Sequence, residues 1–229
     1  MIYITGDIHG DRKRLSRLKL RNLKEGDTLI ICGDFGFLWD NSTAEQNYLM
    51  SLGKRKYNIC FIDGTHENFD LINNYEISQW NGGKVHKIHG NLYHLMRGQV
   101  YEIEGRKIFT MGGGESSDID IRRDVNAWSK DEHPTQEELL EGAENLEFAG
   151  YDIDIIVTHE PPLKVKNFLN LNDPSEFRVS ALNAYFEELS QNCNFRKWYF
   201  GSLHLDKYIS VTHRAIFKDV VNAITGEKI

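Results

Sequence analysis

The chain alternates short apolar segments with segments of helical pattern, and this alternation constrains its fold more than any other feature. Buried strands are expected at residues 2–5, 28–32 and 58–62, with helices at residues 11–21 and 43–52. Fully apolar strands that alternate with helices are typical of a sheet that is covered by helices. The first third of the chain therefore predicts an α/β architecture.

The rest of the chain adds a second region that is rich in strands. Helices are expected at residues 134–148 and 175–189, and Glu104-Gly105 is expected to form a tight hairpin turn. Further strands are expected at residues 84–88, 91–95, 99–104, 107–111, 153–158, 196–200, 208–211, 215–217 and 220–224. Together these elements predict a four-layer αββα sandwich, with two mixed β-sheets inside and helices outside, in a single domain of residues 1–229.

Composition excludes several classes of protein. The 229 residues include 27 Lys and Arg against 34 Asp and Glu, a net charge of −7 that argues against nucleic-acid binding. The three cysteines, Cys32, Cys60 and Cys193, are widely spaced and predict neither a disulfide framework nor a zinc site. No targeting segment is visible, and the apolar stretches are far shorter than the roughly 20 residues that span a bilayer. We therefore expect a cytoplasmic protein without a membrane partner.

Five of the expected strands end in Asp or His, often beside glycine. These ends are Gly6-Asp7-Ile8-His9, Gly33-Asp34, Gly64-Thr65-His66, Thr158-His159 and Gly201-Ser202-Leu203-His204. Ligand sites of α/β sheets gather at the carboxyl ends of strands, and glycine lets the backbone turn sharply there. Carboxylate and imidazole together suit Mn, Fe, Zn or similar ions. If Asp34 bridged two ions about 3.5–4 Å apart, they could activate a hydroxide for attack at phosphorus.

This ordered series resembles the calcineurin-like metallophosphoesterases over essentially the whole chain. The run Gly112-Gly113-Gly114-Glu115-Ser116, followed by Asp118 and Arg122, is similar to a small bacterial subgroup of that superfamily. The resemblance implies hydrolysis of a small phosphomonoester or phosphodiester by a metal-bound hydroxide. It also implies one or two divalent ions, drawn from Mn, Fe, Zn and Ni, with Mn favoured.

The resemblance also assigns roles to individual residues. The first ion would be held by four residues of the series, namely Asp7, His9, Asp34 and His204. The second ion would share Asp34, take His159 and need two further ligands. His66 would act with Asp34 as a catalytic residue, protonating the leaving group or steadying the transition state.

Two positions depart from the family pattern, and both belong to the second ion. Thr65 stands where the family has Asn, and Ser202 stands where it has His. A neutral hydroxyl is a much poorer ligand than an amide oxygen or an imidazole nitrogen. Three interpretations remain open. The second ion is weak or absent; a neighbouring carboxylate of Glu160, Glu67 or Asp206 replaces the lost ligands; or the chain binds a phosphorylated ligand or partner without turnover.

Several other residues have competing interpretations. Arg122, together with His66, is a candidate for binding the substrate phosphate, against the alternative of a solvated loop residue. We expect His86, His89 and His94 to be surface residues, because their odd and even spacing sends them to different faces of an extended chain. Exposed strands in the second half of the chain could pair in a homodimer.

Overall fold

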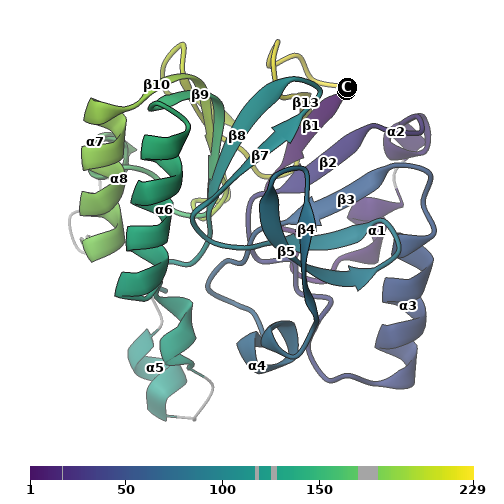
Figure 1. Cartoon of the computed structure of the whole chain (residues 1–229). Coiled ribbons are helices and arrows are strands. Elements are labelled where there is room, and N and C mark those ends of the chain that lie inside the picture. The colour runs from purple at the N-terminus through teal and green to yellow at the C-terminus, as the bar shows by residue number, and fades with distance from the viewer. Residues whose placement is uncertain (17, 117–118, 125–127, 170–179) are drawn as a thin grey trace.

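The computed structural model spans all 229 residues and describes residues 1–16, 18–116, 119–124, 128–169 and 180–229. Two β-sheets lie face to face, and helices cover their outer sides (Figure 1). The predicted α/β fold with two mixed sheets between helices is therefore confirmed.

The first sheet has seven strands in the order β13-β1-β2-β3-β6-β5-β4. Its strands β1, β2, β3 and β6 run parallel, whereas β13, β5 and β4 pair antiparallel with their neighbours. The strands are β1 (Ile2–Thr5), β2 (Thr28–Ile31), β3 (Asn58–Phe61), β4 (Ile77–Trp80), β5 (Gly83–His89), β6 (Leu92–Leu95) and β13 (Val220–Asn222).

The second sheet has six strands in the order β11-β12-β10-β9-β8-β7. Its strands β12, β10, β9 and β8 run parallel, and β11 and β7 form antiparallel edges. The strands are β7 (Gln99–Ile103), β8 (Arg106–Met111), β9 (Asp152–Thr158), β10 (Asn194–Phe200), β11 (Lys207–Tyr208) and β12 (His213–Ala215). Parallel strands align their carboxyl ends in both sheets, which brings the predicted ligands toward one edge.

The helices lie on the two outer faces, with α3 on the first sheet and α6 and α8 on the second (Figure 1). They are α1 (Arg12–Leu15), α2 (Leu18–Arg21), α3 (Thr43–Gly53), α4 (Phe69–Asn73), α5 (Ile119–Asp124), α6 (Gln136–Phe148), α7 (Leu163–Leu169) and α8 (Ala181–Asn192), with a 3-10 turn at Lys130–Glu132. Thr135 and Glu138 form a capping box that starts α6. Among the described helices, none combines the length and apolar character needed to cross a membrane.

Alternate residues of each strand enter different cores. In β1, Tyr3 packs into the cluster that contains Leu52 of α3, whereas Ile2 and Ile4 join the cluster between the two sheets, which includes Ile155. This follows from the two-residue period of a strand, which sends successive side chains to opposite faces. Each fully buried aliphatic side chain stabilises the fold by about 1.5–3 kcal/mol. The layered packing thus holds the strand ends in place.

Four predicted elements differ from the structure. The strand expected at 215–217 is wrong beyond Ala215, because β12 covers His213–Ala215. The helix expected at residues 11–21 is instead two short helices, α1 and α2, because the backbone of Ser16 leaves the helical region at the end of α1 (φ −95°, ψ 1°). The helix expected at 175–189 begins at Ala181 after the N-cap Ser180, and residues 175–179 lie outside the described part. The strand expected at 208–211 is wrong beyond Tyr208, because the next two N–H groups donate to the His213 carbonyl in a tight turn.

Candidate metal centre

Four of the predicted ligands converge at the carboxyl ends of three strands. Asp7 and His9 follow β1, Asp34 follows β2, and His204 follows β10. One ligand atom from each of the four lies within 4.8 Å of the others. This is the set expected for the first ion.

The donor atoms of this group point toward one another. The Nε2 atoms of His9 and His204 are 2.9 Å apart, and His204 Nε2 lies 3.0 Å from Asp7 Oδ2. His9 Nε2 lies 3.8 Å from Asp34 Oδ2. The Asp7 side chain is fully buried, yet within the described part of the chain neither of its oxygens has a partner in hydrogen-bonding geometry. Burying a carboxylate in this way is costly unless a cation completes it, so these oxygen and nitrogen donors fit a divalent ion.

Three of these ligand residues have an unusual backbone conformation. His9, Asp34 and His204 have φ values of 50°, 42° and 51°. A residue other than glycine in this left-handed region costs on the order of 1–3 kcal/mol, and such residues cluster at functional sites. His9 therefore reaches the centre through a sharp turn rather than through extended chain, and the conformation turns each side chain back toward the site.

Glycines beside the ligands make room for them. A Cβ atom on Gly201 would lie 2.1 Å from Asp7 Oδ1, and a Cβ on Gly64 would lie 2.1 Å from Asp34 Oδ1. Both distances are far below van der Waals contact. These glycines are therefore needed because a carboxylate from another strand end occupies that space, from the adjacent strand for Gly64 and from the opposite sheet for Gly201.

Asp34 joins the loops after β2 and β3. Its Oδ1 accepts hydrogen bonds from the backbone N–H groups of Thr65 and His66, both at 2.8 Å. Its Oδ2 lies 3.1 Å from His66 Nδ1. Burial alone would raise the pKa of Asp34, but the charge of His159 and the hydrogen bonds from His66 hold it well below its ordinary value. Asp34 is therefore an ionised, rigidly held carboxylate.

His159, directly after β9, is buried, and a backbone carbonyl from the end of β2 holds its ring. Its Nδ1 donates to the Cys32 carbonyl at 3.1 Å, and its Nε2 lies 3.9 Å from Asp34 Oδ1. Metal-binding histidines commonly show this arrangement, with one ring nitrogen held and the other directed at the ion. Burial lowers the pKa of His159, but the charges of Asp34 and Asp7 outweigh it and raise the pKa well above the ordinary value. His159 is oriented as a ligand but lies outside the group of four.

Thr65 and Ser202 each bond to one of the two residues that the second ion would keep. The Thr65 hydroxyl lies 3.0 Å from His66 Nδ1, and its backbone N–H binds Asp34. The Ser202 N–H donates to the His159 carbonyl at 3.0 Å, while its buried hydroxyl oxygen has no hydrogen-bond partner among the described residues. Thr65 is thus bonded to Asp34, and Ser202 to His159, through backbone N–H groups.

The three carboxylates considered as replacement ligands have other partners. Glu67 accepts two backbone N–H groups of the loop that follows Asp34. Glu160 pairs with Lys166 Nζ at 3.0 Å. Asp206 accepts three backbone N–H groups of residues 217–219. Each of them supports a neighbouring loop or helix.

His66 and Arg122 both lie against the Thr65 segment. His66 is half-buried, and its ring centroid is 6.1 Å from that of His9. Arg122 donates to the Thr65 carbonyl at 3.1 Å and pairs with Glu132 at 3.0 Å. The structure thus places the proposed phosphate-binding arginine beside the site, engaged with a buried carboxylate.

The sequence analysis was wrong about two other histidines. His86 and His94 are buried, because the β5–β6 hairpin pairs them directly across its two strands. Spacing along one extended chain does not apply once a turn separates the residues. The sequence analysis also did not predict the buried ion pair of Asp63 and Arg97. A signal was present, because Asp63 stands beside Gly64 at the end of a strand, as the predicted ligands do.

The comparison with family models identifies the chain. The model that matches is that of the calcineurin-like phosphoesterases, and the match covers residues 1–209. The comparison with curated proteins finds no match. The matched range contains the four clustered ligands together with His66 and His159. The chain therefore belongs to the calcineurin-like phosphoesterase family.

Proposed function

We propose that the protein hydrolyses a small phosphomonoester or phosphodiester with a divalent ion held by Asp7, His9, Asp34 and His204. The observation that carries this proposal is the buried Asp7 carboxylate, which lacks hydrogen bonds and faces imidazole nitrogens from two loops. A divalent ion bound there supplies Lewis-acid activation of water and neutralises charge that develops at phosphorus. Mixed carboxylate and imidazole donors suit Mn, Fe, Zn and Ni, and following the family resemblance we propose Mn among them.

His66 is oriented for proton transfer. The ionised Asp34 carboxylate only accepts hydrogen bonds, so His66 Nδ1 carries the proton that it shares with Asp34 Oδ2. Nε2 is then the nitrogen that gains and loses a proton, as a general acid for the leaving oxygen requires. Arg122 binds the Thr65 carbonyl and so supports the loop from which His66 projects.

We propose further that the protein binds one ion tightly and a second ion weakly or not at all. Asp34 and His159 remain, but the two further ligands of the second ion are the hydroxyls of Thr65 and Ser202. Hydroxyls are weak ligands, and the nearby carboxylates already serve other partners. A single ion activates water less strongly than a pair, so turnover would be slow.

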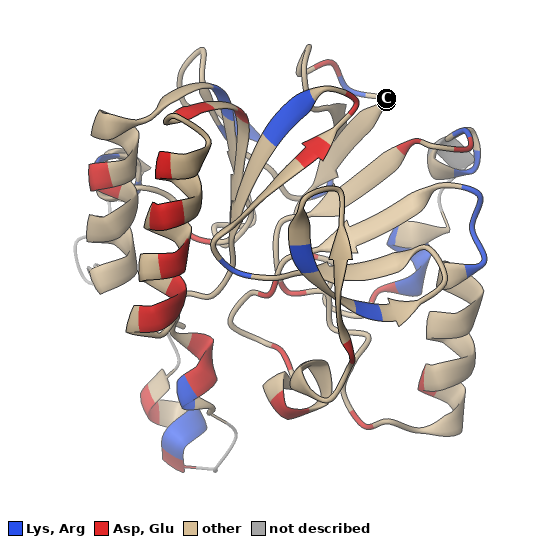
Figure 2. Ribbon diagram, viewed as in Figure 1, with Lys and Arg blue, Asp and Glu red and all other residues tan. Residues whose placement is uncertain are grey.

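The same departures support a second candidate function. Without turnover, the scaffold would bind a phosphorylated ligand or partner through the same ion. Nucleic acid is disfavoured as a ligand in either case. Figure 2 shows acidic residues gathered along α6, with basic residues spread over several elements, and the net charge is −7.

Hydrolysis of an aryl phosphodiester and an aryl phosphomonoester, with Mn²⁺ titrated into metal-free protein, tests the proposal. We expect a saturable rise in rate that Asp34→Asn lacks and that Asp70→Asn, an exposed carboxylate in α4, retains. A rate equal to that of Asp34→Asn at saturating metal, together with normal metal binding, would favour the second candidate function.

A further inference from the structure

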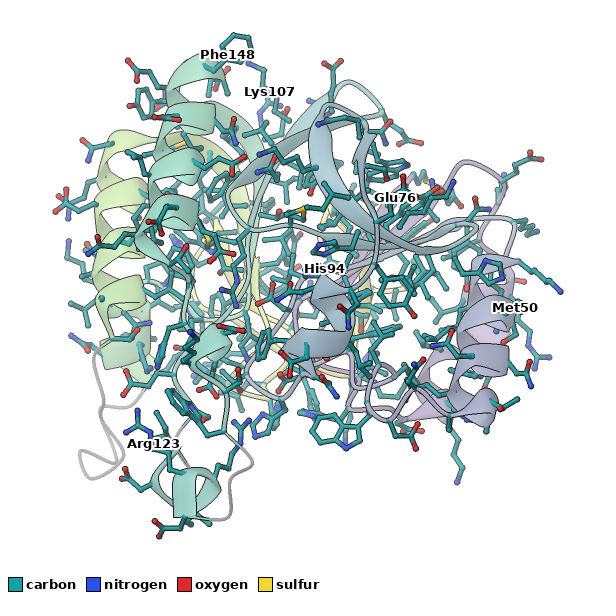
Figure 3. The ribbon with its side chains drawn as sticks, turned by 60° about the horizontal axis from the view of Figure 1, so that its bottom comes forward. Met50, Glu76, His94, Lys107, Arg123 and Phe148 are labelled. Carbon is teal, nitrogen blue, oxygen red and sulfur yellow. The ribbon has the colours of Figure 1, made fainter. Side chains whose placement is uncertain are left out.

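A separate cavity of about 170 Å³ lies between α4, the β5–β6 hairpin and the segment before α6. Its charged and imidazole side chains are Asp63, His86, His94, Arg97, Asp131, His133 and Glu138, and Asn73 and Thr135 add neutral polar groups. Figure 3, which brings the bottom of the molecule forward, shows His94 in the interior beside α4, well away from Arg123. The proposed hydrolysis does not use this cavity.

Three side chains form a hydrogen-bonded row that ends in the cavity. Asp63 Oδ1 lies 3.1 Å from His94 Nε2, and His94 Nδ1 lies 2.9 Å from His86 Nδ1. Arg97 keeps Asp63 ionised, with its Nε 2.9 Å from Asp63 Oδ2. The carboxylate only accepts, so His94 donates from Nε2, and Nδ1 of the same ring is left to accept from His86. His86 therefore donates from Nδ1, and its Nε2 carries a lone pair.

This lone pair has no protein partner in the described part of the chain. His86 is 4% exposed, and the hydrogen bond that it makes there is the one from Nδ1 to His94. Its side chain lines the cavity. Burial lowers the pKa of His86 to about 4, so the lone pair persists at neutral pH. A buried acceptor without a donor is unfavourable unless a ligand or water satisfies it.

Arg97 cannot serve as a donor to a ligand. Its Nε and one terminal nitrogen bind Asp63, and the same terminal nitrogen binds the Asp131 carbonyl. The other terminal nitrogen binds Glu138 and the His133 carbonyl. All five guanidinium N–H groups are thus used in holding the segment before α6 to Asp63.

The cavity therefore offers acceptors and negative charge. The carboxylates of Asp63, Asp131 and Glu138 face a single guanidinium in the lining. The apolar part of the wall comes from Phe69, Ile72 and Met96. A ligand that matches this lining is cationic, donates N–H bonds and has a short apolar portion.

We propose that this cavity binds a small protonated primary amine. Its ammonium group donates to His86 Nε2 and to the carboxylates of Asp131 and Glu138, and its alkyl portion lies against the apolar wall. Anions and bulky quaternary ammonium ions do not satisfy the His86 acceptor, so the site distinguishes amines by their N–H groups.

Titration of protein labelled with ¹⁵N-histidine tests the proposal independently of catalysis. The probe is propylammonium chloride, and tetramethylammonium chloride is the control because it has the same charge but no N–H group. At constant ionic strength, we expect propylammonium to produce a saturable shift of the His86 Nε2 resonance. Tetramethylammonium should produce none. An equal response to both ions, or no saturable response to propylammonium, would overturn the proposal.

Two variants locate the site. His86→Phe keeps a ring but removes the acceptor, and it should abolish the saturable stabilisation by propylammonium in thermal unfolding. Asp131→Asn keeps the backbone carbonyl that Arg97 uses, and it should weaken binding several-fold in a correctly folded protein. Asp152→Asn, an exposed carboxylate of β9, is the matched control and should bind normally. Unchanged affinity in Asp131→Asn and His86→Phe would contradict the assignment.

Discussion

At the scale of single residues, our one-ion proposal rests on two positions, Thr65 and Ser202. Ligand atoms of Asp7, His9, Asp34 and His204 lie within 4.8 Å of one another, whereas His159 lies outside this group and its Nε2 is 3.9 Å from Asp34 Oδ1. Backbone hydrogen bonds tie Thr65 to Asp34 and Ser202 to His159, so new side chains at either position would start close to that pair.

Restoring the family ligands should therefore restore the second ion. We expect Thr65→Asn combined with Ser202→His to raise the bound metal from one ion to two per chain in native mass spectrometry. The matched control, Thr65→Val with Ser202→Ala, should keep one ion. Two ions in the unaltered protein would show that hydroxyls suffice as ligands and would contradict the one-ion proposal.

A second prediction at this scale concerns Asp63 and the way the free energy of unfolding depends on pH. Burial would raise its pKa, but Arg97 and His94 hold the pKa far below the ordinary 3.8. The carboxylate therefore binds protons more weakly in the folded state than in the unfolded state. Its contribution to the free energy of unfolding is fully present above pH 3.8 and is lost as the pH falls below that value. Asp63→Asn should lower the free energy of unfolding by about 3–5 kcal/mol at neutral pH, because Arg97 loses its buried partner.

Urea unfolding of both proteins between neutral pH and the acid range measures this difference. The difference in free energy of unfolding between the unaltered protein and Asp63→Asn should become smaller as the pH falls below 3.8, the ordinary pKa of Asp. Asp152→Asn, at an exposed position, should show no comparable gap. A gap that stays constant with pH would show that Asp63 acts through packing rather than charge.

At the scale of elements, the strand ends act as a rigid frame for the ligands. Each ligand follows a buried strand, and the turn after it has a left-handed residue or a glycine. The neighbouring loops then approach so closely that carboxylates fill the space a Cβ would take. Ligand geometry is therefore a property of adjacent strands rather than of one loop.

Gly201→Ala tests this close approach. The new Cβ would lie 2.1 Å from Asp7 Oδ1 and 2.5 Å from the Cys32 carbonyl oxygen, so Asp7 must move. We expect metal affinity to fall about tenfold or more, as for other changes that disturb ligand orientation. Isothermal titration with Mn²⁺ measures it. Gly150→Ala, where a Cβ meets open space, should lose some stability through its positive φ but keep its metal affinity.

At the scale of the whole molecule, the C-terminal residues complete both sheets. The family match ends at residue 209, yet β12 and β13 lie beyond it. β13 pairs with β1, which leads to Asp7, and β12 pairs with β10, which leads to His204. The last segment therefore supports the two strands from which much of the metal centre projects.

Ile216 connects this segment to the core between the sheets. Its side chain is fully buried in the cluster that contains Ile4 and Ile155. Ile216→Ala should lower the free energy of unfolding by about 2–5 kcal/mol in chemical denaturation, the usual cost of a large cavity. Ile224→Ala, at a side chain that is 40% exposed, should cost far less. Equal effects would mean that the terminal segment is not part of the cooperative core.

Most of the strands and the layer order could be read from local pattern, but β4 (Ile77–Trp80) was not predicted. Apolar runs such as 28–32 fold as buried strands wherever they meet other strands, and each carries its own terminal Asp or His. Family resemblance then named the four ligands that the structure brings together. The sequence also predicted that Thr65 and Ser202 are weak metal ligands, because that prediction depends only on the chemistry of their side chains.

What the sequence determined by itself was therefore local: which segments form strands, and which ligands follow them. Only the tertiary structure decided which distant groups share a space. The β5–β6 pairing buried His86 against His94, and the approach of Arg97 to Asp63 created a cavity unrelated to the metal centre. Such contacts depend on which strands pair and in which register. The periodicity of apolar residues along the chain predicts the type of each element but not which strands become neighbours.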